Sequence, residues 1–306
     1  MGVNERLTDR ERVELTKKSY EHLQLGDNIT IGPYDIGTVC RVEHAKDGMS
    51  AFVISSPSEI TILFKGSYGI KKGTPQTWRD EWFKTNIPIL RAMLSQERRI
   101  PSQLKTASTF LNHVINQFRG SRFYIYGHSL GSINAQFALA NCTHPEAIAA
   151  AYLYEGTNIW LLLTPKERRR VAQMRERVFN YVDIYDPVTL GITETHHMVG
   201  KLCYVDSEPM QPIKQHMWGG YQFNPDGSLK LRKIDQAFLA ESRSEHKLLS
   251  RSGELTDSIE KISSSDEIKK MATEKIDELT KRYPDHKSLV KLAELFKNEL
   301  LKDEDK

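Results

Sequence analysis

The chain has 306 residues, with 43 Lys or Arg against 40 Asp or Glu and a net charge of +3. This length suits one large domain with an appendage, and so balanced a charge gives no reason to expect a nucleic-acid partner. The cysteines, Cys40, Cys142 and Cys203, are odd in number and widely spaced, which argues against a disulfide scaffold or a cysteine metal site.

The N-terminal residues 1–12 are charged where a signal peptide needs an apolar segment, and no apolar run is long enough to span a membrane. We therefore expect a soluble protein that is cytoplasmic or is secreted by a route without a cleavable signal peptide. Residues 7–25 carry spaced apolar side chains between Thr8, a suitable N-cap, and Gly26, a helix stop. This pattern predicts a first helix that packs on the outside of a sheet.

Strand and helix patterns then follow along the chain. They predict strands at 36–42, 51–55 and 60–64, helices at 78–96 and 104–118, a strand ending at 127, a helix at 132–141, a strand at 146–154, a helix at 164–177, and strands at 178–185 and 201–205. Turn residues separate the first three strands, which favours hairpins. The later alternation of strand and helix favours a mostly parallel sheet with helices on both faces, an α/β fold.

The most informative stretch runs from Arg122 to Gly131, where an apolar strand-type run ends in Gly-His-Ser-Leu-Gly and a helical pattern follows at once. Although Gly-x-Ser-x-Gly also arises by chance, this context favours a nucleophile elbow, with the Ser129 hydroxyl exposed at a strained turn. Gly127 and Gly131 are needed because a Cβ atom there would collide with the neighbouring strand and helix. The N–H of Leu130, at the start of the helix, would be one oxyanion donor.

A second oxyanion donor is expected in the loop that follows the strand at 60–64. That strand ends in Lys-Gly-Ser, and a strand that stops in a glycine turn leaves backbone N–H groups pointing outward. We assign the Ser67 N–H to this role, while a simple hairpin exit stays open as the alternative. His128, inside the elbow, is interpreted as a packing and hydrogen-bonding residue whose side chain points away from Ser129.

A serine nucleophile needs a base, and a carboxylate must orient that base. In α/β folds with a nucleophile elbow, the catalytic residues follow along the chain in the order serine, acid, histidine. Asp186 stands at the end of a β-type run before a proline and is favoured over Asp183, which falls within the run. His216 follows the last strand and is favoured as the base over His196 and His197, which precede it. No third ligand stands at a suitable spacing to that histidine pair, so a metal is not indicated.

These motifs resemble, in order and rough position, those of the class 3 lipases, the fungal-lipase-like branch of the α/β hydrolases. The resemblance covers about residues 38–221 and rests on Phe64-Lys-Gly-Ser67, Gly127-His-Ser-Leu-Gly131, Asp186-Pro-Val188, His197 and His216-Met-Trp-Gly219. It implies an α/β-hydrolase fold, a triad of Ser129, Asp186 and His216, and an oxyanion hole at Ser67 and Leu130. The sequence departs from the family's Asp-x-Val-Pro acid motif, which keeps Asp183 open, and its interval from acid to histidine is short.

Residues 241–306 differ in composition from the preceding part of the chain, because charged residues dominate and apolar residues form narrow helical stripes. We therefore divide the chain into a hydrolase domain at 1–240 and a charged helical segment at 241–306. A solvated tail and a protein-binding element are both open for these helices. A hydrolase ahead of such a segment also resembles, in architecture only, the lipase effectors of Gram-positive type VII secretion.

An apolar run after the strand at 146–154 is the candidate lipid contact. Trp160, Leu161 and Leu162 lie beyond the strand's carboxyl end, where α/β sheets place their ligand crevice. Basic residues follow from Lys166, and a Trp–Leu wedge beside such a cluster would suit an anionic membrane surface. The alternative is that these side chains belong to the core and that the basic residues are solvated.

The sequence thus predicts a serine ester hydrolase that acts on acyl lipids, either a triacylglycerol lipase or a phospholipase of the A type. Its partner would be the lipid or another acyl ester, with transient membrane-surface contact, and neither a metal nor an organic cofactor is needed. A thioesterase or short-chain esterase shares this machinery. A non-catalytic binding protein that keeps the hydrolase shell is the alternative of a different class.

Overall fold

Eight strands form one sheet in the part of the chain that the computed structural model describes, namely residues 2–66, 100–186, 189, 197–236, 238–240, 274, 277 and 281. They stand side by side in chain order: β1 (Asn28–Ile31), β2 (Tyr34–His44), β3 (Ser50–Ser55), β4 (Glu59–Phe64), β5 (Arg122–His128), β6 (Ile148–Tyr154), β7 (Val178–Val182) and β8 (Lys201–Tyr204). Strands β1 to β4 pair antiparallel, and β4 to β8 pair parallel. The predicted hairpins and the parallel sheet that follows them are confirmed, whereas β1 was not predicted.

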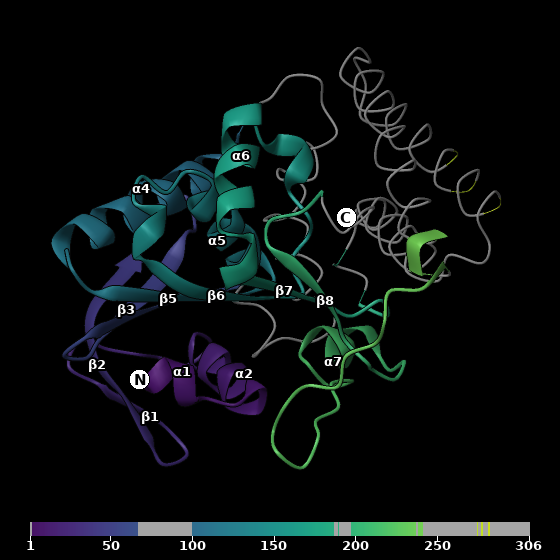
Figure 1. The fold of residues 1–306 in the computed structure, drawn as a ribbon, viewed down its shortest axis with the longest axis horizontal. Helices are drawn as coiled ribbons and strands as arrows, with labels where there is room; N and C mark the ends of the chain where they lie inside the picture. Colours follow the sequence, from purple (N-terminus) through teal and green to yellow (C-terminus); the bar gives the residue numbers. More distant parts are fainter. Residues whose placement is uncertain are drawn as a thin grey trace, which may run out of the picture.

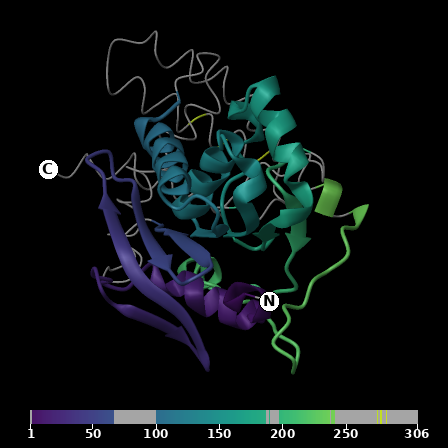
Figure 2. The ribbon, with the colours of Figure 1, turned by 60° about the vertical axis from the view of Figure 1, so that its left-hand side comes forward.

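Helices cover both faces of this sheet, as the sequence predicted (Figure 1). On one face lie α4 (Ser102–Gln117), α5 (Leu130–Ala140) and α6 (Pro165–Gln173), and on the other lie α1 (Val3–Arg6) and α2 (Asp9–Lys18). The view in Figure 2 shows the same two layers of helices on either side of the strands. Short 3-10 helices occur at η2 (Pro145–Ala147), η3 (Trp160–Leu162) and η4 (Arg175–Arg177). The predicted helix at 164–177 is therefore divided into α6 and η4.

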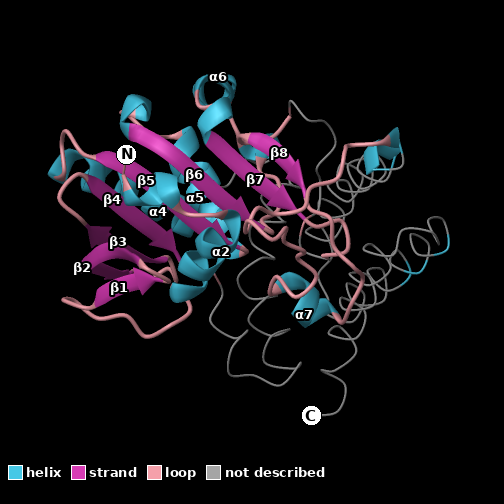
Figure 3. Cartoon of the chain, turned by 60° about the horizontal axis from the view of Figure 1, so that its bottom comes forward, coloured by secondary structure: helices cyan, strands magenta, loops and turns pink. Residues whose placement is uncertain are grey.

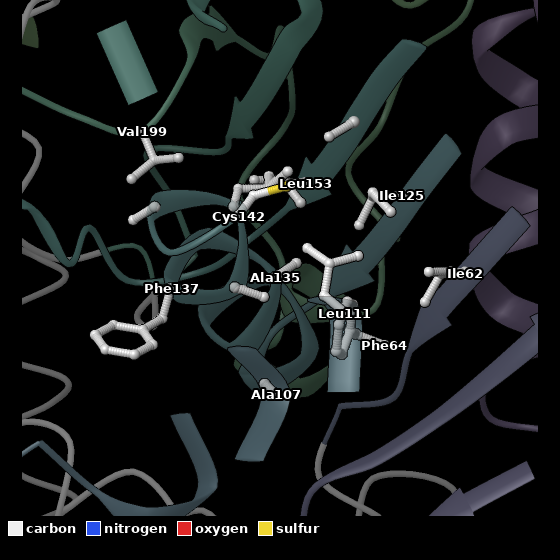
Figure 4. Close-up of a cluster of buried hydrophobic side chains, with 14 of the residues drawn as sticks. Ile62, Phe64, Ala107, Leu111, Ile125, Ala135, Phe137, Cys142, Leu153 and Val199 are labelled. Carbon is white, nitrogen blue, oxygen red and sulfur yellow. The ribbon is translucent and has the colours of Figure 1, made fainter. Parts of the chain in front are cut away.

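The larger hydrophobic core lies between the sheet and helices α4 and α5 (Figure 4). Every residue of β4 is buried, because a central strand with elements on both faces has no solvent side. In α4 the buried apolar residues recur three or four positions apart, at Leu104, Ala107, Leu111 and Val114, and so form one stripe that faces the sheet. Helix α7 (Pro212–His216) lies on the side toward which the arrowheads of β6 to β8 point (Figure 3).

The N-terminal segment is fastened to the opposite face of the sheet by buried polar contacts. The Asn4 amide donates to Glu59 Oε2 at 3.1 Å and to Thr61 Oγ1 at 2.9 Å in β4. The Tyr126 hydroxyl in β5 donates to Asn4 Oδ1 at 2.8 Å. Because each of these groups is buried and paired, residues 2–6 are part of the folded domain.

Helix α2 begins as predicted and ends earlier than predicted. Thr8 caps its first turn and forms a capping box with Glu11. After Lys18 the chain tightens into a 3-10-like turn, in which the N–H of Tyr20 donates to the carbonyl of Lys17 at 3.0 Å. This turn buries the aromatic ring of Tyr20 and the side chain of Leu23 against the sheet, which a straight helix to residue 25 would not do.

Several sequence predictions fall outside the described residues. They are the helix at 78–96, the oxyanion residue Ser67, His196 and nearly all of the C-terminal segment 241–306. In that segment Glu274, Asp277 and Lys281 are described, and all three are helical. The division of the chain at residue 240 stays a prediction. Among the described residues, no helix has both the length and the apolar character needed to cross a membrane.

Candidate active site

Ser129 occupies the turn between β5 and α5. Its backbone conformation, with φ 56° and ψ −126°, is one that residues other than glycine rarely adopt. The flanking glycines are required as predicted. A Cβ atom at Gly127 would lie 2.6 Å from the carbonyl oxygen of Gly131, and one at Gly131 would lie 2.2 Å from the carbonyl oxygen of Phe64 in β4. The sheet and the helix therefore hold the strained turn from both sides, as in a nucleophile elbow.

The environment of Ser129 differs from the prediction in one respect, because the serine is fully buried and was expected to be exposed. Its N–H donates to the carbonyl of Tyr154 at 2.9 Å, which joins the turn to the end of β6. Every residue of α5 is buried as well, so a serine at the start of this central helix has little surface of its own. Among the described residues, Ser129 Oγ has no hydrogen-bond partner.

Leu130 is the first residue of α5, and the N–H groups of a first helical turn have no acceptor within the helix. Its N–H is therefore free of helical pairing at the position predicted for an oxyanion donor. The second predicted donor, Ser67, lies outside the described residues. Gly66, the residue before it, is buried two residues beyond the end of β4, and a Cβ atom there would lie 2.9 Å from the carbonyl oxygen of His128.

The structure brings His216 and Asp186 together. His216 Nδ1 lies 2.7 Å from Asp186 Oδ2, and both side chains have no exposed surface. A carboxylate only accepts hydrogen bonds, so Nδ1 carries the proton, and in a neutral ring Nε2 is the nitrogen that can accept one. Asp186 is placed just beyond β7 by its own N–H, which donates to the carbonyl of Asp183 at 3.0 Å. His216 is the last residue of α7.

The other acid candidate, Asp183, binds a different set of groups. Its Oδ1 accepts from Ser207 Oγ at 2.5 Å and from the Tyr185 N–H at 2.9 Å. Its Oδ2 accepts from the Gln215 side chain. Burial raises the pKa of Asp183 to about 6, although these hydrogen bonds act in the opposite direction. Asp183 thus lies beside the histidine helix and pairs with Gln215, while Asp186 pairs with His216.

The alternative base His197 contacts other residues. Its ring is exposed and stacks on the indole of Trp160, with centroids 5.6 Å apart and planes inclined by 19°. Its carbonyl accepts from the Asn158 side chain at 2.8 Å. Its neighbour His196 is outside the described residues.

The prediction that His128 packs and hydrogen-bonds agrees with its position. Tyr20 Oη lies 2.5 Å from His128 Nδ1, and His128 Nε2 lies 2.7 Å from the carbonyl oxygen of His216. The His128 ring is fully buried between the rings of Trp218 and His216, with centroids 3.8 Å and 4.7 Å away. Burial, together with repulsion from His216, lowers the pKa of His128 well below its usual range, so the ring is neutral.

Glu155 is a site residue that the sequence analysis missed. It follows β6 directly, at φ 49°, and is fully buried. Its Oε2 accepts from the Asp183 N–H at 3.1 Å, and its Oε1 accepts from the Tyr221 hydroxyl. Burial and the charges of Asp186 and Asp183 raise the pKa of Glu155 well above its usual range. The one sequence signal was an acidic residue placed directly after a buried strand.

The candidate lipid-contact residues have three different environments in η3. Trp160 is partly buried against the core, Leu161 is 37% exposed, and Leu162 is buried in the core. The Arg168 guanidinium lies 5.3 Å from the centre of the Trp160 ring and donates to the Trp160 carbonyl at 3.0 Å. Of the basic residues that follow, Lys166 and Arg169 are the exposed ones. Trp160 and Leu161 therefore remain available at the surface, and Leu162 does not.

No group of three or more His, Cys, Asp or Glu in the described ranges could hold a metal ion. The carboxyl groups near His216 instead find hydrogen-bond donors within the protein, as described above for Asp183 and Glu155.

Comparison with known proteins gave no matching family model and no match among curated sequences. Among solved structures, the chain is similar to a triacylglycerol lipase from Penicillium expansum, with 13% identity, a TM-score of 0.43 and coverage of 76% of this chain and 85% of that one. It is also similar to a lipase from Yarrowia lipolytica, with 11% identity, a TM-score of 0.39 and coverage of 79% and 91%. A Rhizomucor miehei lipase, solved in complex with its propeptide, has 15% identity, a TM-score of 0.40 and coverage of 64% and 66%.

The parallel strands, the helices on both faces and the serine elbow between β5 and α5 define the fold. This chain has an α/β-hydrolase fold. The three solved structures named above are lipases from fungi, and the sequence motifs resemble the fungal-lipase-like group. Because the likeness to them is distant, the function proposed below rests on the residues of this site.

Proposed function

We propose that this protein is a serine ester hydrolase that acts on acyl lipids, with Ser129 as nucleophile, His216 as base and Asp186 as the orienting acid. The observation that supports the proposal best is the buried pair of His216 and Asp186, 2.7 Å apart, together with a serine held at a strained elbow. The residue before Ser129 also contacts the main chain of His216. A buried, oriented imidazole whose main chain is bonded to the residue before a strained serine suits nucleophilic catalysis better than packing.

In the first half of the reaction, His216 Nε2 takes the proton from Ser129 Oγ as this oxygen attacks the ester carbonyl. The N–H groups of Leu130 and Ser67 donate to the oxyanion that forms on the substrate. Asp186 stabilises the imidazolium and keeps its Nδ1 proton in place. As the bond to the leaving alcohol breaks, His216 gives its proton to the alkoxide, and an acyl group remains on Ser129.

In the second half, His216 takes a proton from a water molecule that attacks the acyl-enzyme carbonyl. The tetrahedral intermediate uses the same oxyanion donors, and its collapse returns the proton to Ser129 and releases the carboxylic acid. Every proton transfer is thus made by this chain's own groups, and no cofactor enters the sequence of steps.

An acyl lipid is the proposed substrate class because an apolar residue and an indole lie at the surface of η3. Leu161 is exposed, Trp160 is partly so, and the exposed cations Lys166 and Arg169 follow in the next helix. Such a combination suits a lipid surface with anionic character. Both triacylglycerol and phospholipid esters fit this description, and the hydrolase machinery is shared with thioesterases and short-chain esterases.

The test is hydrolysis of triacylglycerol, phospholipid, a soluble short-chain ester and an acyl thioester by the wild-type protein and by Ser129→Ala. We expect turnover of dispersed lipid by the wild type and none above background by the variant, with an unchanged melting temperature, because the hydroxyl has no partner to lose among the described residues. Near wild-type turnover by Ser129→Ala would refute the enzyme proposal. A wild type that binds lipid without hydrolysing it would support the binding-protein alternative.

A further inference from the structure

Tyr20 brings the N-terminal segment into contact with the candidate active site. Its ring is buried just after α2, and its hydroxyl lies 2.5 Å from His128 Nδ1, across the face of the sheet opposite α5. Burial raises the pKa of Tyr20, so the phenol keeps its proton and acts as a donor. A residue from the start of the chain is thereby bonded to the residue that precedes Ser129.

The hydrogen bonds of His128 have fixed directions. The His216 carbonyl can only accept, so His128 Nε2 carries the ring's proton and donates to it across 2.7 Å. A neutral imidazole has one N–H group, so Nδ1 is an acceptor and takes the hydrogen bond from Tyr20. The chain of bonds therefore runs from the Tyr20 hydroxyl through the His128 ring to the main chain of His216.

The neutral state of His128 matters for the base that lies beside it. The two imidazole rings have centroids 4.7 Å apart, and a charge on His128 would oppose the protonation that His216 undergoes during catalysis. The Lys17 ammonium lies 5.8 Å from the centre of the Trp218 ring and also disfavours a charge on His128. These surroundings thus keep the His128 ring uncharged while it links Tyr20 to His216 through its two hydrogen bonds.

The Tyr20 hydroxyl also contacts the start of the loop assigned to the second oxyanion donor. A Cβ atom at Gly66 would lie 2.0 Å from Tyr20 Oη and 2.9 Å from the carbonyl oxygen of His128. No side chain larger than hydrogen fits between them. Tyr20 therefore touches both the residue that bonds the base and the residue that precedes Ser67.

We propose that Tyr20 is a positioning residue of this active site: through His128 it fixes the main chain of His216, and through Gly66 it fixes the start of the oxyanion loop. This inference rests on the proposed hydrolase function for its kinetic consequence. The role requires the hydroxyl, because the ring alone would fill space without directing His128.

The experiment compares Tyr20→Phe with Tyr126→Phe. Both substitutions remove one buried hydroxyl that bonds the N-terminal segment to β5, and the Tyr126 hydroxyl bonds Asn4 where the Tyr20 hydroxyl bonds His128. We expect Tyr20→Phe to lower kcat on a soluble short-chain ester about tenfold with little change in KM, as for the loss of one buried hydrogen bond. Tyr126→Phe should lower the melting temperature by about as much as Tyr20→Phe does, because each loses one buried hydrogen bond. Unlike Tyr20→Phe, it should leave kcat unchanged.

A spectroscopic readout separates this inference from the proposed function. In protein labelled with ¹⁵N-histidine, the Nδ1 proton of His216 reports its bond to Asp186 whether or not the protein turns over an ester. Tyr20→Phe should shift this resonance, and Tyr126→Phe should not. An unmoved resonance in Tyr20→Phe, or equal loss of kcat in both variants, would overturn the positioning role. A shifted resonance in a protein with no esterase activity would keep the positioning role and refute the proposed function.

Discussion

The Gln215 side chain donates a hydrogen bond to Asp183 Oδ2. Asp183 therefore holds Gln215, the residue directly before His216. Gln215 is further fixed by its Oε1 atom, which accepts from the Met210 N–H at 2.7 Å. The two acids at the end of β7 therefore act on neighbouring residues of α7. One orients the imidazole, and the other holds the backbone turn that carries it.

This division of labour predicts unequal losses for two isosteric substitutions. Asp186→Asn should lower kcat by about 10⁴, because an amide stabilises the wrong imidazole tautomer. Asp183→Asn should lower kcat by only about tenfold, since it disturbs His216 through a single hydrogen bond to Gln215. Both are measured on a soluble ester, with circular dichroism to verify folding. A greater loss for Asp183→Asn would reassign the catalytic acid.

The burial of Asp183 predicts a pH dependence of stability. Its pKa is raised to about 6 in the folded protein, against about 3.9 for an unperturbed aspartate. Between these values the folded state holds a proton that the unfolded state has lost, so the free energy of unfolding falls as the pH rises. The contribution is about 3 kcal/mol over the window from about pH 4 to pH 6. Glu155, whose pKa is also raised by burial, adds a decrease of the same sign as the pH rises.

Urea unfolding of the wild type and of Asp183→Asn, measured at intervals from pH 4 to pH 7, checks this expectation. The variant lacks the titrating group, so its curve should be flatter than that of the wild type by the stated amount. Parallel curves for the two proteins would mean that Asp183 is not protonated in the folded state near pH 5.

The choice of base gives a third prediction. His216→Ala should abolish hydrolysis to the same extent as Ser129→Ala, because a nucleophile and its base act as one unit. His197→Ala should retain activity on a soluble ester, since the His197 ring stacks on Trp160 and the carboxylate of Asp186 pairs with His216. An inactive His197→Ala beside an active His216→Ala would show that the base is assigned wrongly.

The sequence was sufficient for those features that a local pattern determines. The strand, turn and helix around Ser129, the Thr8 cap and the glycine requirement at 127 and 131 follow from steric and hydrogen-bond rules that act within a few residues. The parallel sheet followed from the alternation of strands and helices. The pairing of Asp186 with His216 also agrees with a positional rule, since a side chain at the end of a strand can turn toward the carboxyl edge of the sheet.

Other features depend on contacts between distant parts of the chain, and no local pattern contained them. In the sequence, Tyr20 cannot be distinguished from an ordinary aromatic residue of an amphipathic helix. Its contact with His128 arises only because the chain turns after Lys18. The burial of Ser129 depends on how deeply α5 is packed. Glu155 looks like an ordinary turn residue, and only the fold surrounds it with Tyr221 and two aspartates.

The surface of η3 gives the last prediction. Trp160→Ala combined with Leu161→Ala removes the partly exposed indole and the exposed leucine. If they enter a lipid surface, their loss should weaken binding to anionic vesicles and lower the rate on dispersed lipid by about tenfold or more, since burying one such side chain contributes about 1.5–3 kcal/mol. The rate on a soluble short-chain ester should stay close to that of the wild type.

The matched control is Leu162→Ala, because Leu162 lies in the same 3-10 helix and its side chain is buried in the core. Its truncation should cost about 2–5 kcal/mol of stability and lower the rates on both substrates together, since a cavity affects the fold and not the surface. A double variant of Trp160 and Leu161 that behaves like Leu162→Ala, with equal losses on lipid and soluble ester and a lower melting temperature, would place these two side chains in the core. A selective loss on lipid would instead place them at the interface, with Lys166 and Arg169 as the next residues to neutralise on anionic and zwitterionic vesicles.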